Sequence, residues 1–526
     1  MATAEESKLI NQGSYGCIYY PSLPFQLSRD KHKAKKHHHH PPDEQQQQEQ
    51  QQQRAKYVSK LQKHNFHSEF EDYIGKKIQE IPSFELFFVP ILKTHKIDLA
   101  TIKQSHVTDC DAISKYIKRS GERGITSNDY TILNKKFIIQ KMKYINGISL
   151  RRYISNIARS PSSIDAYTSE SDDADDARAD DAHADDPDEY VSKSLRKDER
   201  QLAKYRAQFK EDEQNATSFH LMSVVFDMYE RIIDSIQILI KYKLVHYDLK
   251  ENNILIEHTQ QLPYIIDFGL SVDVARLLEH PWSDKQEESS SSSHTKIDSD
   301  VLYRTNSSKI FQHNYLWRQH FYVHAPDYFL WPIEVHLMTY LINEQDTLTD
   351  ESLRKICYEY IRTNKAFAYM SREFKKKLFR LSVATFTRFV HQPREKVLNE
   401  LLKYWTKWDM YAINIMFLKI LYEMVFHVDR DDDQDQDDHQ DQDQDDHQDD
   451  YQDQGDQRQK ILDPHYSSDA SIVFKNRFKI KLKQKYNNEK IMNTIQIMLR
   501  NIHPDPDKRM TPQETKTFFI SIFYEC

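Results

Sequence analysis

Four polar tracts interrupt this 526-residue chain and limit where a folded body can form. None of the tracts carries the apolar periodicity that would offset the entropy lost on ordering it. We therefore predict surface insertions at about 26–55, 158–215, 281–300 and 429–458. Outside the tracts, enough apolar sequence remains for a sizeable core, since 38% of all residues are hydrophobic and 12% are aromatic.

The formal charge of −8 hides a basic body, because acidic residues concentrate in two tracts. About 12 acidic residues lie between positions 165 and 189, and about 15 lie between 429 and 456. The rest of the chain has a formal charge near +17. A basic body fits a phosphate-rich ligand or an acidic partner. The excess is dispersed and carries no recognisable nucleic-acid motif, so we expect no specific nucleic-acid binding.

Targeting and cysteine patterns favour an intracellular protein, cytoplasmic or nuclear. No apolar run approaches the roughly 18 residues needed to cross a bilayer, and the N-terminal sequence lacks an apolar signal core, so we expect no membrane association. The four cysteines, at positions 17, 110, 357 and 526, are scattered and form neither a CxxC pair nor a disulfide framework. We therefore expect reduced cysteines. His37 to His40 are adjacent and cannot all converge on one metal ion, so low-complexity sequence is the better interpretation.

A glycine pair near the N-terminus suits a phosphate-binding hairpin. The segment I-N-Q-G-S-Y-G-C-I-Y starts at Ile10, and only 8 of the 526 residues are glycine. Two glycines this close together allow the backbone to approach phosphates without side-chain interference. An ordinary hairpin turn is the alternative. The predicted nucleotide-binding residues of this loop are Asn11, Gly13, Ser14, Tyr15, Gly16 and Ile18.

The segment Y-V-S-K places Lys60 at the end of a short extended run that points the side chain inward. A buried ammonium needs anionic partners such as the α- and β-phosphates of a nucleotide. Lys60 is therefore the predicted nucleotide anchor, with Lys56 and Lys63 as neighbouring alternatives.

The next segment, 67–81, has isoleucines at helical spacing and predicts an amphipathic helix that ends before Pro82. Glu71 lies beside the apolar face and can turn inward to pair with Lys60, and Glu69 is the competing partner. Residues 137–150 then predict a buried strand, a connector and a helix start, which is typical of a hinge between two lobes.

The strongest chemical signal is L-V-H-Y-D-L-K-E-N-N-I-L-I over 244–256, followed by Y-I-I-D-F-G-L over 264–270. Asp248 can accept a hydrogen bond from an attacking hydroxyl, and Lys250 can offset charge on a transferred phosphoryl group. Asn253 and Asp267 supply the hard oxygen ligands that Mg²⁺ prefers.

These two segments resemble the protein kinase superfamily, with His246-Tyr247-Asp248 at the HRD position and Asp267-Phe268-Gly269 at the DFG position. The resemblance implies an α+β fold, with a small β-rich N-lobe and a mainly helical C-lobe. It also implies ATP and Mg²⁺ as cofactors, and protein substrates as partners. The lysine two places after Asp248 looks like the serine/threonine class. Two departures stand out: Asn11 replaces the first glycine of the phosphate loop, and Tyr247 replaces the usual arginine.

Later segments resemble further kinase landmarks. Asp409, in W-D-M-Y-A-I-N-I, matches an acid that braces the catalytic loop, and Arg509 matches an arginine that pairs with a glutamate closing the activation segment. Glu334 is the favoured glutamate and Asp327 is the alternative. The W-P-I-E segment and the large insertions look similar to kinases of large DNA viruses.

We therefore expect an N-lobe over 1–145, a C-lobe over 146–526 and a hinge near 143–149. The predicted function is ATP-dependent phosphoryl transfer to serine or threonine hydroxyls of proteins. The alternative is an inactive kinase-fold scaffold that binds partners.

Overall fold

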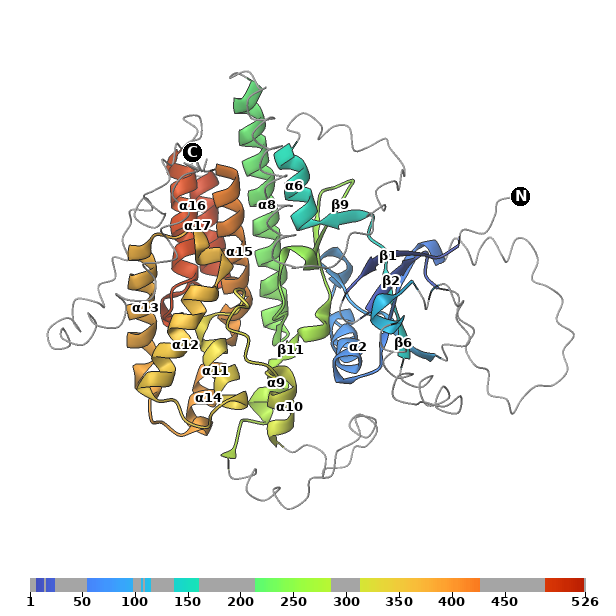
Figure 1. Ribbon diagram of the computed structural model, residues 1–526. Coiled ribbons are helices and arrows are strands. Elements are labelled where there is room, and N and C mark those ends of the chain that lie inside the picture. Colours follow the sequence, from blue (N-terminus) through green and yellow to red (C-terminus); the bar gives the residue numbers. More distant parts are fainter. Residues whose placement is uncertain are drawn as a thin grey trace, which may run out of the picture.

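The computed structural model describes residues 6–13, 16–23, 54–97, 106, 109–114, 137–159, 213–284, 313–425 and 488–524 (Figure 1). The insertions predicted at 26–55, 158–215, 281–300 and 429–458 lie almost wholly outside these ranges, as do Ser14 and Tyr15.

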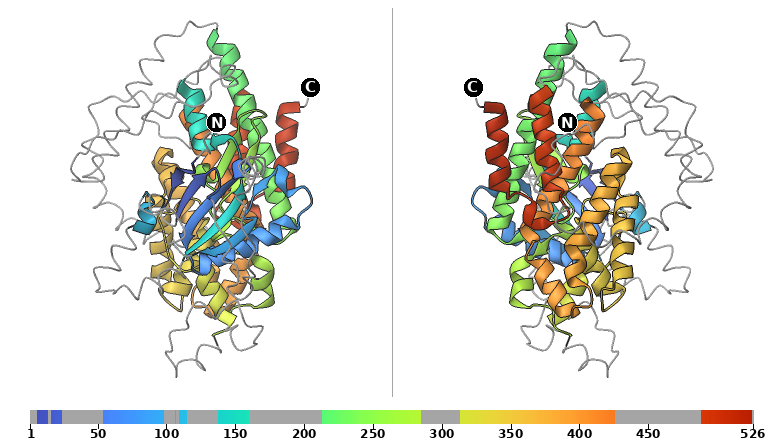
Figure 2. Two further views of the ribbon diagram at one scale, coloured as in Figure 1. Left: turned by 90° about the vertical axis from the view of Figure 1, so that its right-hand side faces the viewer. Right: turned by 90° about the vertical axis from the view of Figure 1, so that its left-hand side faces the viewer.

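The N-terminal part forms an antiparallel five-stranded sheet in the order β1-β2-β3-β6-β5. Its strands are β1 (Lys8–Gln12), β2 (Gly16–Tyr20), β3 (Tyr57–Lys63), β5 (Lys93–Ile97) and β6 (Phe137–Lys143). Helix α2 (Phe66–Gln79) follows β3 and lies between this sheet and the helical part of the molecule (Figures 1 and 2).

The local sequence accounts for α2. Asn65 caps its first turn through a capping box with Ser68, and the helix ends at Gln79, shortly before Pro82. Ile74 and Ile78 are fully buried, as the predicted amphipathic helix requires.

Shorter strands form two further sheets. One sheet has the order β4-β10-β9-β7, from β4 (Phe88–Val89), β7 (Gly147–Ser149), β9 (Ile254–Glu257) and β10 (Pro263–Ile266). A second sheet pairs β8 (Leu244–Val245) with β11 (Val272–Asp273). The predicted strand, connector and helix start over 137–150 correspond to β6, β7 and the start of α6 (Leu150–Arg159). The 3₁₀ turns η4 (Glu251–Asn253) and η5 (Phe268–Leu270) follow β8 and β10.

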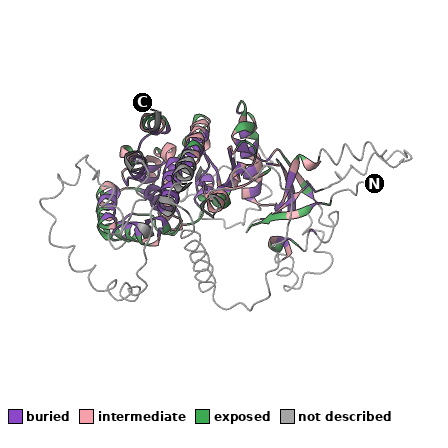
Figure 3. Cartoon of the chain, turned by 90° about the horizontal axis from the view of Figure 1, so that it is seen from above, coloured by how far each residue is buried: buried purple, intermediate pink, exposed green. Residues whose placement is uncertain are grey.

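The remaining described residues are mostly helical, which gives a mixed α+β fold. The helices are α8 (Glu213–Lys241), α9 (Val274–Glu279), α10 (His313–His320), α11 (Ile333–Asn343), α12 (Asp350–Thr363), α13 (Arg372–Phe386), α14 (Arg394–Leu402), α15 (Trp408–Val425), α16 (Asn488–Asn501) and α17 (Pro512–Tyr524). Helix α15 packs against α8 and α16 and is buried on nearly every side. Buried residues line the facing sides of these elements and exposed ones lie outside (Figure 3). Within the described ranges, no helix combines the length and apolarity needed to span a bilayer.

Two expectations are wrong. Cys17 on β2 and Cys110 form a disulfide with a Cα–Cα distance of 5.8 Å, although we expected reduced cysteines. The two positions are 93 residues apart, so their approach depends on tertiary folding and leaves no local pattern. Trp282 falls inside the predicted 281–300 insertion, yet it is fully buried against Trp317. The polar composition of the residues that follow it concealed this core position.

Candidate active site

Lys60 on β3 lies between two carboxylates. Its Nζ is 2.9 and 3.0 Å from the two carboxylate oxygens of Glu71 and 3.1 Å from Oδ1 of Asp267. The Lys60 and Glu71 side chains are 12% and 3% exposed. The competing acid, Glu69, contacts His64 instead. Of the predicted alternatives, the structure therefore pairs Glu71 with Lys60.

Electrostatics favour the charged forms of Lys60 and Asp267, whereas burial raises the pKa of Glu71 above its usual value. Burial alone would lower the pKa of Lys60, but the charges of Asp267 and Glu71 hold it above its usual range. The Lys60 charge in turn holds the pKa of Asp267 below its usual range, and Lys250 acts in the same direction. An ammonium and an ionised Asp267 therefore coexist near neutral pH, which suits recognition of a metal-bound polyphosphate.

The carboxylate of Asp248 is surrounded by donors. Nζ of Lys250 donates to Oδ2 at 2.9 Å and to Oδ1 at 3.2 Å, and Nδ2 of Asn253 donates to Oδ2 at 2.9 Å. The Tyr328 hydroxyl donates to Oδ1. Asp248 itself is only 6% exposed, so these contacts fix its orientation.

Tyr328 is a site residue that sequence reasoning did not identify. It precedes Glu334 by six residues and is 80 positions from Asp248. Tyr328 begins the apolar run Y-F-L-W over 328–331, and this local order gives no signal for a contact with a residue 80 positions away.

Asp409 braces the loop that carries Asp248, as its motif indicated. Its Oδ2 accepts from the backbone N–H of His246 at 2.7 Å, and its Oδ1 accepts from that of Tyr247 at 3.0 Å. The His246 ring bonds the carbonyl oxygen of Ile266 at 2.9 Å, directly before Asp267. These bonds tie together the two loops that carry Asp248 and Asp267.

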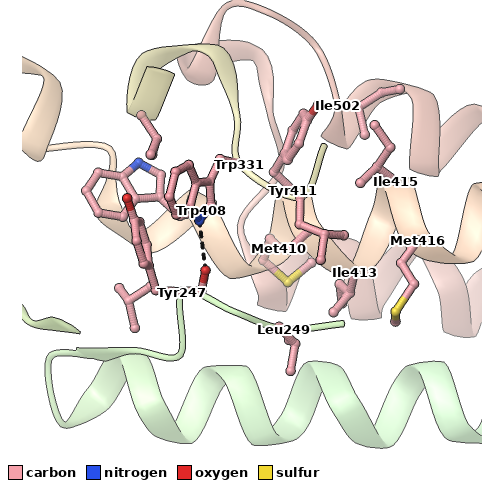
Figure 4. Packing of buried hydrophobic residues seen from close by; sticks show 14 of the residues in the cluster. Tyr247, Leu249, Trp331, Trp408, Met410, Tyr411, Ile413, Ile415, Met416 and Ile502 are labelled. Carbon is pink, nitrogen blue, oxygen red and sulfur yellow. Dashed lines mark hydrogen bonds between the residues drawn. The ribbon is translucent and has the colours of Figure 1, made fainter. Parts of the chain in front are cut away.

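Tyr247 occupies the position where the motif usually has arginine, and it is packed among aromatic rings. Its ring stacks on Trp331 at a centroid distance of 4.7 Å, and Trp331 Nε1 donates to the Tyr247 carbonyl at 2.9 Å (Figure 4). Burial raises the pKa of the Tyr247 hydroxyl well above its usual value, so the side chain stays neutral.

The start of helix α11, which carries Glu334, is held by a buried ion pair. Arg509 donates through two nitrogens to the two oxygens of Glu334, at 2.6 and 2.9 Å. Both side chains are almost fully buried, at 1% and 0% exposed. The choice of Glu334 over Asp327 is confirmed.

The two glycines of the N-terminal hairpin, Gly13 and Gly16, differ in how closely other atoms surround them. Gly13 donates its N–H to the Gly16 carbonyl at 2.9 Å, and a Cβ at Gly13 would meet nothing within 4 Å. A Cβ at Gly16 would lie 2.5 Å from the Leu61 carbonyl oxygen, so strand packing itself requires that glycine. Asn11 pairs with Ile18 across the two strands. Among the described residues nothing requires glycine at position 13, so the phosphate-binding role of this hairpin stays a prediction.

Asn253 and Asp267 present the oxygen donors that a hard divalent cation requires. Asn253 uses its amide nitrogen on Asp248, so its amide oxygen is the atom suited to a metal. The Asp267 side chain is 45% exposed. Across the part of the chain that the structure describes, no cluster of three or more His, Cys, Asp or Glu forms a metal centre by itself. The two-residue donor set fits Mg²⁺ that arrives with a nucleotide.

Comparison with known proteins supports a kinase-type fold. Residues 207–283 match the RIO domain. The RIO domain is an atypical protein kinase family within the kinase superfamily, so the match supports ATP use and phosphotransferase chemistry. The match covers the elements from α8 through α9 and includes Asp248, Lys250, Asn253 and Asp267. No curated protein matches the chain.

Proposed function

We propose that this chain is a protein kinase that transfers the γ-phosphoryl group of ATP to serine or threonine hydroxyls of protein substrates. One observation carries the proposal: Lys60 is held by Glu71 and Asp267 while Asp248 is oriented by Lys250 and Asn253. Kinase chemistry needs both arrangements, one to position the phosphates and one to orient the acceptor. The proposed division is an N-lobe over 1–145 and a C-lobe over 146–526.

In the proposed mechanism, Lys60 binds the α- and β-phosphates and Glu71 fixes the direction of its ammonium. Asp248 accepts a hydrogen bond from the substrate hydroxyl and directs its oxygen at the γ-phosphorus. A new O–P bond forms as the bond from the γ-phosphorus to the β,γ-bridging oxygen breaks, so ADP leaves, and the hydroxyl proton passes to the Asp248 carboxylate and from there to solvent. Lys250 neutralises charge on the transferred group.

Asn253 and Asp267 would hold Mg²⁺, which supplies charge neutralisation at the phosphates when bound. Neighbouring residues of the chain orient these two metal ligands. The hydrogen bond from Lys60 orients the Asp267 carboxylate, and the hydrogen bond from Asn253 to Asp248 orients the Asn253 amide.

The test is a transfer assay with labelled ATP, Mg²⁺ and generic acceptor proteins, followed by identification of the phosphorylated amino acid. We expect phosphoserine or phosphothreonine from the wild-type protein and a loss of at least about 100-fold for Lys60→Met. Lys403→Gln is the control, because that side chain is 64% exposed and pairs with Glu400, three residues earlier in the chain. Label on tyrosine alone would refute the serine/threonine assignment. A wild-type protein that binds nucleotide without any transfer would favour the scaffold alternative.

A further inference from the structure

A fully buried carboxylate lies six positions after Asp267. Asp273 is 0% exposed, and its Oδ2 accepts from Lys77 Nζ at 2.6 Å and from the Tyr73 hydroxyl at 2.7 Å. Both donors lie on α2, the helix that carries Glu71. Asp273 is therefore one point at which the segment after Asp267 holds α2, beside the contacts of η5 with the same helix.

Asp273 is also connected to the catalytic loop through the backbone. It lies on β11 and pairs with Leu244 of β8, and the next residue, Val274, donates its N–H to the carbonyl oxygen of Lys243 at 3.0 Å. Strand β8 runs directly into His246 and Asp248. A contact from α2 to Asp273 thus fixes the helix relative to the residues proposed to orient the substrate.

The contacts of α2 with Lys60 and with Asp273 act on different sides of the helix, and bonds from Gln79 to Ile91 and from Thr94 to Asp72 hold α2 to the neighbouring strand segment as well. With about 100° per residue, Tyr73 and Lys77 lie roughly 200° and 240° around the axis from Glu71. Lys60 therefore holds one face of α2, and Asp273 holds a nearly opposite face. Contacts on two faces prevent the helix from rotating about its axis, and such a rotation would separate Glu71 from Lys60.

This arrangement matters because the Lys–Glu pair is the element that activation-segment phosphorylation and helix positioning control in many kinases. A phosphate gains charge-assisted bonds where it meets a cation. At the position next to Asp248, this chain has the neutral, aromatic-packed Tyr247 instead of arginine. The anion that contacts α2 is supplied by the chain itself, at Asp273.

We propose that Asp273 is a positioning residue, a built-in carboxylate that holds α2 through Lys77 and Tyr73 and so keeps Glu71 on Lys60 without phosphorylation. The inference rests on the proposed function, because it concerns how that site is kept assembled. If it is correct, activity depends on the Lys77–Asp273 ion pair and does not depend on phosphorylation of the protein.

The test compares Asp273→Asn, Lys77→Met and the double variant, each checked for cooperative thermal unfolding. Asparagine preserves the shape of Asp273, and the Lys77 side chain is 30% exposed, so both single variants should fold. We expect kcat/KM for ATP to fall at least about tenfold in each single variant, with no more than roughly a further twofold loss in the double variant. Lys76→Met is the matched control on the same helix, since that side chain is 70% exposed and pairs with Asp72.

A second cycle separates positioning from a general structural role. Glu71→Gln should cost at least about tenfold in the wild-type background but less than about threefold beside Asp273→Asn, because the Lys60–Glu71 pair is already lost there. Affinity for a nonhydrolysable ATP analogue should show the same pattern, and it can be measured even if no acceptor is phosphorylated. An inactive wild type would refute the proposed function, and the affinity cycle would still decide the role of Asp273.

Three results would overturn the proposal. The first is a folded Asp273→Asn or Lys77→Met protein with the kcat/KM and the affinity of the wild type. The second is full additivity of the Asp273→Asn and Glu71→Gln effects. The third is a roughly tenfold loss of wild-type activity after phosphatase treatment that rephosphorylation restores.

Discussion

The Arg509–Glu334 pair gives a quantitative test of the fold. Replacing Arg509 by Met leaves the Glu334 carboxylate buried without its two nitrogen donors. It also removes the bond from Arg509 Nε to the His503 carbonyl. Breaking a buried pair on one side costs about 3–5 kcal/mol. At roughly 2–4 °C per kcal/mol for a large domain, the midpoint of thermal unfolding should drop by about 10 °C.

The assay is thermal unfolding followed by circular dichroism at constant pH and scan rate. Lys403→Gln breaks an exposed ion pair worth about 0–1 kcal/mol and should shift the midpoint by no more than about 2 °C. Adding Glu334→Leu to Arg509→Met should recover part of the loss, because no lone charge then remains buried. A shift below about 3 °C for Arg509→Met alone would refute the reasoning.

Three further predictions concern pH, the disulfide and Tyr328. Burial lowers the pKa of His336 to about 3 from an ordinary value of 6.5, so the unfolded chain binds more protons between these values and stability falls as pH drops through that window. His336→Leu should therefore reduce the stability difference between pH 7 and pH 5 by about 2 kcal/mol in urea unfolding, and an unchanged difference would contradict this. Reduction of Cys17–Cys110, or Cys17→Ser, should lower stability by about 4 kcal/mol, since the bond closes a loop of sequence separation 93; equal midpoints with and without dithiothreitol would refute it. Tyr328→Phe removes one donor from Asp248 and should lower kcat by roughly 5–30-fold, from a bond of about 1–2 kcal/mol, and unchanged kcat would show that the contact does not orient the carboxylate.

The parts of the site that could be predicted from the sequence are those whose residues lie close together in the chain at a spacing that their contacts require. Asp248, Lys250 and Asn253 lie within six residues, and their mutual contacts follow from that local order. The Glu71 partner of Lys60 was predictable because helical periodicity placed it beside the apolar face.

Contacts between distant segments could not be predicted in the same way. Asp273 meets Tyr73 across 200 residues, and Tyr328 meets Asp248 across 80. Neither pair has a spacing that local propensity controls. Gly16 shows a related limit, because the sequence pointed to phosphate approach whereas the structure shows that strand packing against Leu61 already requires a glycine.

The most direct test of the central claim is the effect of Asp248→Asn on two separate quantities, nucleotide affinity and the rate of phosphoryl transfer. Asn253 and Asp267 remain in this variant, so affinity for MgATP should stay within about threefold of wild type. The loss of the acceptor-orienting carboxylate should lower kcat by about 10²–10⁴-fold. A folded Asp248→Asn protein that transfers phosphate at a near wild-type rate would contradict the account.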